Sequence, residues 1–179
     1  VGYPVTFAVM LVASVLTGTL ASKLKDHARL SARSAFRTQV LFDTDRLLQK
    51  AKSNDDILSV TCMQLSRLLD RSIVAYTKSE NGMSTGRLFA EKKYTYSENL
   101  LNAAEQKAAE WAFQNGRRTG ATTAQFGKSE CLYLAIRAGD RVYGVIGIPM
   151  RPEKPDSFEN SIVLSVVNEC ALAMDNTHN

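Results

Sequence analysis

The fold is decided by residues 131–149, which read CLYLAIRAGDRVYGVIGIP. Residues 131–137 and 142–149 are rich in apolar and β-branched side chains, and residues 138–141 (Ala-Gly-Asp-Arg) form a turn signal between them. This pattern predicts two antiparallel strands joined as a hairpin. Upstream, residues 72–77 (SIVAYT) are a shorter β-rich run, and residues 87–90 are expected to pair with it across a turn. The sequence therefore predicts a small antiparallel sheet.

Helical patterns surround these strands. Three helices are expected in this part of the chain, over residues 55–70, 97–114 and 157–176. The first follows a cap signal at Ser53, and the second is expected to end at Asn115-Gly116 in a left-handed cap. Residues 117–129 are polar and are predicted to be a loop. The order of elements predicts an α+β fold, with an antiparallel sheet flanked by helices and preceded by a long N-terminal helix.

The N-terminal segment has a different character. From Val1 to Ser22 there is no charged side chain. About 20 apolar residues in a helix span the hydrocarbon core of a bilayer. The basic residues that follow are Lys23, Lys25, Arg29, Arg33 and Arg37. Such residues place their end of a span in the cytoplasm, next to anionic lipid head groups. Residues 1–22 are therefore predicted to be a transmembrane helix, and the alternative is a long buried helix of a soluble protein.

Residues 23–52 are predicted to continue this helix as a juxtamembrane linker, because no Pro or Gly occurs between Thr19 and Asn81. One stripe of the linker has heptad spacing but weakly apolar members, namely Leu24, Ala28, Ser31, Ala35, Thr38 and Phe42. Two interpretations stay open: a coiled coil with a second copy of the chain, and a solvated helix that pairs with nothing. Residues 53–179 then form the predicted globular domain.

Composition excludes several function classes. The formal net charge of +4 and the pI near 9.0 are typical of nucleic-acid-binding proteins. The excess of basic residues lies mostly between Lys23 and Lys52, however, which favours a membrane surface over DNA or RNA. Cys62, Cys131 and Cys170 have no CxxC spacing and are expected to be free thiols, and no metal-site spacing occurs. The chain starts at Val1 rather than Met, which indicates a piece of a longer protein.

Three stretches resemble known signalling proteins. Residues 2–38, GYPVTFAVMLVASVLTGTLASKLKDHARLSARSAFRT, resemble the last transmembrane and juxtamembrane helices of Kdp-type potassium-sensing histidine kinases. Residues 109–123, AEWAFQNGRRTGATT, are similar to the helix end and loop of the GAF-like domain that follows in those kinases. Residues 131–148 are similar to its hairpin, in a form found in many GAF domains.

This resemblance implies a GAF-like domain in a homodimeric sensor kinase of the bacterial cytoplasmic membrane, with the domain facing the cytoplasm. It implies regulation of a potassium-uptake operon through a response regulator. ATP and Mg²⁺ are implied only for the kinase core, whose nucleotide-binding boxes and phosphoacceptor motif do not occur in this sequence. No cofactor, metal or catalytic residue is expected in the chain itself.

Ligands of GAF domains bind between the sheet and the neighbouring helix and loop. The residues expected to line such a pocket here are Trp111, Phe113, Arg118, Thr122, Phe126, Tyr133, Arg137 and Tyr143. The other interpretation is a domain that packs, dimerises and transmits a signal mechanically. Two alternatives remain: a receptor domain for a small molecule or cyclic nucleotide in another membrane signalling protein, and a cysteine-based methionine sulfoxide reductase.

Overall fold

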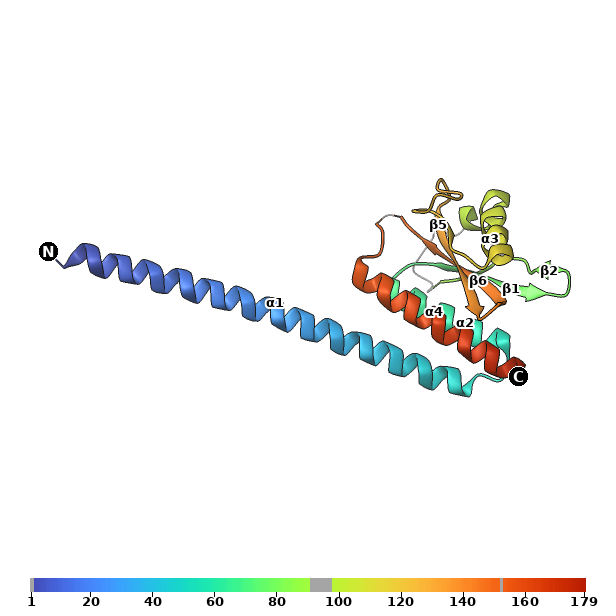
Figure 1. Cartoon of the computed structure of the whole chain (residues 1–179), viewed down its shortest axis with the longest axis horizontal. Helices are drawn as coiled ribbons and strands as arrows, with labels where there is room; N and C mark the ends of the chain where they lie inside the picture. The colour runs from blue at the N-terminus through green and yellow to red at the C-terminus, as the bar shows by residue number, and fades with distance from the viewer. Residues whose placement is uncertain (1, 91–97, 152) are drawn as a thin grey trace. The chain divides into compact units, whose positions relative to one another are not determined.

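A computed structural model describes residues 2–90, 98–151 and 153–179 of the chain (Figure 1). The chain divides into two compact units, Val1–Val40 and Leu41–Asn179. Helix α1 (Tyr3–Lys50) is continuous over 48 residues, as the absence of Pro and Gly after Thr19 predicts. The hydroxyl of Thr17 donates to the carbonyl of Ala13 over 2.8 Å, so this polar side chain is satisfied within the helix.

The first part of α1 has the length and composition of a membrane span. Its most apolar 18-residue window has a mean hydropathy of 1.9, and none of that window is buried. At the other end of the helix, Thr44 and Leu48 are buried in the second unit. The last turns of α1, which the sequence assigns to the linker, are thus part of the compact unit that begins at Leu41.

A single antiparallel sheet forms the centre of the second unit. Its strands are β1 (Ile73–Ser79), β2 (Gly82–Met83), β3 (Arg87–Phe89), β4 (Thr119–Gly120), β5 (Cys131–Ala138) and β6 (Arg141–Pro149). They are ordered β2-β1-β6-β5-β4, and β3 also pairs with β1. The β5–β6 pair runs from Cys131 opposite Pro149 to Ala138 opposite Arg141, which confirms the predicted hairpin.

One part of the expected loop 117–129 is a strand. Thr119 and Gly120 pair with Tyr133 and Leu132, so β4 closes the edge of the sheet. Thr119 is fully buried, and its hydroxyl donates to the carbonyl of Gln125 over 3.0 Å. A two-residue strand rich in Thr and Gly leaves no alternating pattern, which is why the sequence does not predict it.

Helices cover both faces of the sheet. α2 (Asn54–Leu69) and α4 (Ser157–His178) pack on one face, and α3 (Ala103–Asn115) packs on the other, as Figure 1 shows. A short 3₁₀ helix, η1 (Glu98–Leu101), precedes α3. Side chains of β1 alternate between the two faces of the sheet, so residues 73 and 75 point to one face and residues 74 and 76 to the other. The sheet therefore has an apolar core on each face.

The helix ends follow local sequence signals. The hydroxyl of Ser53 accepts from the backbone N–H of Asp56 and caps α2, as predicted. Gly116 ends α3 with φ of 62°, which confirms the expected left-handed cap. The start of α3 differs from the prediction, because Asn102 caps a helix that begins at Ala103. The predicted cap at Ser97 lies outside the described residues.

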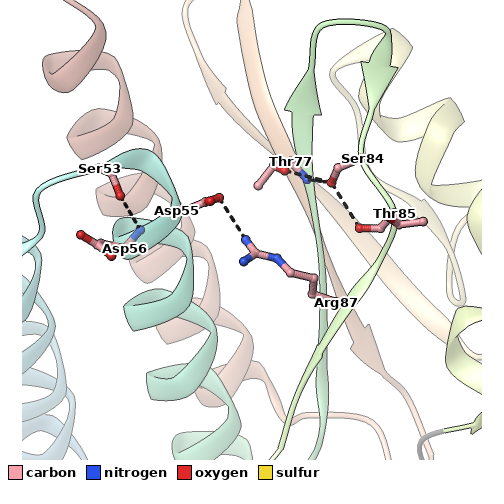
Figure 2. A network of polar contacts seen from close by, with 7 residues as sticks. All are labelled: Ser53, Asp55, Asp56, Thr77, Ser84, Thr85 and Arg87. Carbon is pink, nitrogen blue, oxygen red and sulfur yellow. Dashed lines mark hydrogen bonds and ion pairs between the residues drawn. The ribbon is translucent and has the colours of Figure 1, made fainter.

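Polar contacts join the start of α2 to the outer strands (Figure 2). The guanidinium of Arg87 on β3 lies 3.2 Å from a carboxylate oxygen of Asp55. The backbone N–H of Thr77 on β1 donates to the hydroxyl of Ser84 over 3.0 Å. The first contact joins α2 to β3, and the second joins β1 to the residue that follows β2.

Candidate functional site in the interior between the sheet and helix α3

Helix α3 lies on the sheet through its smallest residues. Ala108, Ala109 and Ala112 are fully buried, and they face large side chains of three strands. The core on this side of the sheet consists of Val74, Tyr76, Leu100, Ala108, Ala109, Ala112, Cys131, Tyr133 and Val145. Small residues on the helix allow a close approach to the tyrosine rings, so this is the interior where a ligand of such a domain would have to bind.

A carboxylate lies at the centre of this interior. Glu105, on the same face of α3 as Ala108 and Ala112, is only 3% exposed. It accepts a hydrogen bond of 2.5 Å from the hydroxyl of Tyr133 and one of 2.8 Å from the backbone N–H of Glu130. A buried carboxylate is tolerated when its oxygens are hydrogen-bonded. Glu105 therefore fastens α3 both to β5 and to the segment that leads into β5.

Two tyrosines fill the space beside Glu105. The rings of Tyr76 and Tyr133 meet edge to face, with centroids 6.4 Å apart and an interplanar angle of 61°. The Tyr76 hydroxyl is buried and has no hydrogen-bond partner among the described residues. Burial, with a smaller effect of Cys131 and Glu105, raises the pKa of Tyr76 to about 12. Burial also raises the pKa of Tyr133, so both rings stay neutral at physiological pH.

Glycines on neighbouring strands give the Tyr133 ring its place. A Cβ atom at Gly147 would lie 2.6 Å from Cε1 of Tyr133, and one at Gly120 would lie 3.1 Å from its Cδ2. Gly120 also has φ of 95°, a conformation that L side chains rarely adopt. The ring is thus packed directly against backbone on both sides. This part of the interior is occupied by the protein's own side chains.

The structure separates the eight residues that the sequence proposes for a pocket. Tyr133 is fully buried, and Phe113 is half-buried against the same core. Trp111 is also half-buried, and its carbonyl accepts from the side-chain amide of Asn115. The exposed members are Arg118, Thr122, Phe126 and Arg137. Tyr143 is buried, but its hydroxyl bonds to Asp175 on α4, on the opposite side of the sheet from α3.

Sequence reasoning missed Glu105 and Tyr76, which are central to this interior. A signal for Glu105 was present, because residues 105, 108, 109 and 112 have the spacing of one helix face. A lone carboxylate on a face of alanines indicates a buried polar contact. Its partner Tyr133 is 28 residues away, and that pairing depends on how β5 lies under α3.

The three thiols are structural. Cys62, Cys131 and Cys170 are all free and fully buried. Burial raises the pKa of Cys131 to about 12 and that of Cys170 to about 11. A thiol must ionise and be accessible to act as a nucleophile. Their burial therefore favours a role for the three cysteines as small core residues, as the sequence predicts. It disfavours a role as the catalytic thiols of a sulfoxide reductase.

A hollow lies on the α4 side of the compact unit. It is lined by residues of the end of α1, the start of α2 and the end of α4, including Leu48, Ile57, Glu169 and Leu172. Burial and the nearby carboxylate of Asp45 raise the pKa of Glu169. None of the eight residues expected in a ligand pocket lines this hollow.

The basic residues expected at a membrane surface all lie on α1. Lys23, Lys25, Arg29 and Arg33 are exposed, and Arg37 is half-buried. Steps of four residues put Arg29, Arg33 and Arg37 along one stripe of this helix.

An antiparallel sheet with two helices on one face and a third helix over a closed interior defines a GAF-like domain. The described fold matches the crystal structure of the native GAF domain of the potassium sensor histidine kinase KdpD from Escherichia coli. The TM-score is 0.58 at 17% identity, over 79% of this chain and 94% of that one. No family model matches the chain.

Sequence comparison gives the particular relationship. The chain is 30% identical to the sensor protein KdpD of Clostridium acetobutylicum, in an alignment of 179 positions that covers 97% of the chain. It is 23% identical to the sensor protein KdpD of Escherichia coli over 146 residues, or 82% of the chain. The chain is therefore homologous to a region of KdpD, and it spans 19% and 15% of the lengths of these two relatives.

Proposed function

We propose that this chain is the membrane-proximal helix and GAF-like domain of a potassium-sensing two-component histidine kinase. The alignment with the Clostridium acetobutylicum protein carries this proposal, because it extends over 97% of the chain and so includes α1 as well as the domain. The kinase core and its ATP, Mg²⁺ and response regulator belong to the rest of such a protein. The chain itself transmits the signal between the membrane and that core.

Transmission through helices, rather than binding of a small ligand, is the role we assign to the domain. The packing of Tyr76 and Tyr133 between the strands and the alanines of α3 supports this role, because a ligand would have to displace them. The elements that connect the domain to its neighbours along the chain are α1 and α4. A change in the tilt or register of either helix can bias a two-state signalling protein.

We further propose that the protein works as a homodimer attached to the cytoplasmic face of a bacterial membrane. The apolar window of α1 supports a membrane span, and the basic residues after it support contact with anionic lipid. The heptad spacing of the weakly apolar stripe on α1, from Leu24 to Phe42, supports pairing with a second copy.

A chimeric sensor tests the proposed function. The matching region of the Escherichia coli sensor KdpD is replaced by this chain, and autophosphorylation in membranes is measured at low and high potassium. We expect the chimera to phosphorylate itself and to respond to potassium limitation. The matched control carries Leu58→Asp, which puts a charge at a fully buried position of α2 and should abolish the response. A chimera that reaches the membrane in normal amounts but is inactive in both conditions contradicts the proposal.

A further inference from the structure

The hairpin at the centre of the sheet contains one irregularity. Ile136 pairs with Gly144 and Arg137 pairs with Val142, so Tyr143 has no partner on β5. Strand β6 thus has one residue more than β5 at this point, and this irregularity is a β-bulge. Bulges re-aim side chains, because they shift the alternation of the strand by one position.

The bulge changes the face to which Tyr143 points. Val145 belongs to the core on the α3 side, and regular alternation would place Tyr143 on the same side. Val142 points to the α3 side instead. Its Cγ2 would lie 3.4 Å from a Cβ atom placed on Gly116, at the end of α3. Tyr143 is turned to the other face, where α4 packs.

On that face Tyr143 contacts the last turn of α4. Its hydroxyl donates a hydrogen bond of 2.5 Å to Oδ1 of Asp175. Its ring also meets the ring of His178 edge to face, with centroids 6.3 Å apart. An acidic side chain in the last turn of a helix is unfavourable beside the negative end of the helix dipole. The Tyr143 hydroxyl compensates Asp175, so the end of α4 depends on this contact with the sheet.

We propose that Tyr143 is a positioning residue that fixes the end of α4 to the β5–β6 hairpin and so couples the sheet to the helix that leaves the domain. The bulge is the device that makes this contact, since a regular strand would direct the tyrosine towards α3. The inference deepens the proposed function and rests on it only for the statement that α4 carries a signal onward. The coupling itself is a property of the domain.

Hydrogen exchange of the full chain in detergent micelles tests the coupling without any kinase activity. In Tyr143→Phe, the amides of residues 173–178 should exchange about tenfold faster or more, as loss of a hydrogen bond to a charged group implies. Amides of α2 and β5 should keep their rates. Asp175→Asn retains an acceptor oxygen for the tyrosine hydroxyl, so this variant should remain closer to the wild type than Tyr143→Phe.

Thr177→Ala is the matched control, because Thr177 is exposed in the same helix turn and its hydroxyl donates to the carbonyl of Ala173 within α4 rather than to the sheet. It should not accelerate exchange at residues 173–178. Unchanged exchange in Tyr143→Phe would overturn the proposal. An equal acceleration over the whole domain would also overturn it, because it would mean a general loss of stability. If the exchange result holds while the chimeric sensor is inactive, the coupling stands and the kinase assignment fails.

Discussion

The hydroxyl of Tyr133 and the carboxylate of Glu105 are joined by a hydrogen bond of 2.5 Å inside the domain, where Glu105 is 3% exposed. This bond links β5 to α3 across the interior in which a GAF-like domain would hold a ligand. The neighbouring Tyr76 is also buried, but its hydroxyl has no hydrogen-bond partner in the part of the chain that the structure describes. The two tyrosines therefore provide a matched pair for measuring what holds this interior together.

Tyr133→Phe should destabilise the domain, and Tyr76→Phe should not. Removing the Tyr133 hydroxyl leaves a buried carboxylate oxygen of Glu105 without its donor, which costs about 1–3 kcal/mol. Removing the Tyr76 hydroxyl deletes a buried polar group that makes no hydrogen bond to the described residues, so the free energy of unfolding should stay the same or rise. Urea unfolding of the compact unit Leu41–Asn179 measures both variants. Equal losses for the two substitutions would mean that the Glu105 contact contributes nothing.

In alkaline solution, stability should begin to fall at a lower pH than the one at which unfolded tyrosines ionise. Cys170 has a folded pKa of about 11, raised by burial from its ordinary value of 9. Below pH 9 the thiol is protonated in both states, and between pH 9 and 11 only the unfolded chain loses the proton. The free energy of unfolding therefore decreases as pH rises through this window, by at most about 1.4 kcal/mol per pH unit for each such thiol.

The pH dependence can be assigned with one variant. Replacing Cys62, Cys131 and Cys170 together by Ala should move the onset of the decrease from about pH 9 towards pH 10, where unfolded tyrosines ionise. Tyr76, with a folded pKa of about 12, then becomes a main source of the remaining slope. Urea unfolding between pH 8 and 11 measures the onset. An onset that the triple variant leaves in place would show that the thiols are accessible in the folded state.

The cap of α2 should contribute more than the ion pair beside it. Ser53→Ala removes the acceptor of the Asp56 N–H and should lower the free energy of unfolding by about 1 kcal/mol, whereas Ser53→Asp should preserve it. Arg87→Ala breaks the ion pair with Asp55. The side chain of Arg87 is 42% exposed and that of Asp55 is 71% exposed, so the loss should be less than about 0.5 kcal/mol. Thermal or urea unfolding compares the three variants, and a larger loss for Arg87→Ala than for Ser53→Ala would reverse this ranking.

The basic stripe of α1 should give binding to anionic lipid. In residues 23–179, replacing Arg29, Arg33 and Arg37 by Gln removes about 3 kcal/mol of attraction, at about 1 kcal/mol for each cation. Affinity for phosphatidylglycerol vesicles should then fall about 100-fold, and added salt should weaken the wild type similarly. The control replaces the exposed residues Arg117, Arg118 and Lys128, with the same change in charge. Equal losses in both triple variants would mean that net charge alone determines binding.

The central strands and the helices could be predicted because their signals are local. The hairpin of residues 131–149 has apolar runs on both sides of a Gly-Asp turn, and Ser53 and Gly116 mark helix ends by their own chemistry. β4 could not be predicted, since Thr119 and Gly120 become a strand only by pairing with β5. The same limit applies to the start of α3, where a short 3₁₀ helix occupies residues predicted as α-helix.

Less of the site could be predicted, because its residues are brought together by the sheet. Tyr133 is in the interior, as its position on β5 implies, but Tyr143 would share its side of the sheet only if β6 were regular. A single bulge turns Tyr143 towards α4, and no composition signal in the sequence marks it. Glu105 was visible as a lone acid among alanines, although its partner was not.

Light scattering of the full chain in detergent micelles tests homodimeric signal transmission most directly. We predict a dimer for the full chain, and a monomer for the compact unit Leu41–Asn179, which lacks the heptad stripe from Leu24 to Thr38. A full chain that stays monomeric at every concentration would contradict transmission through paired helices.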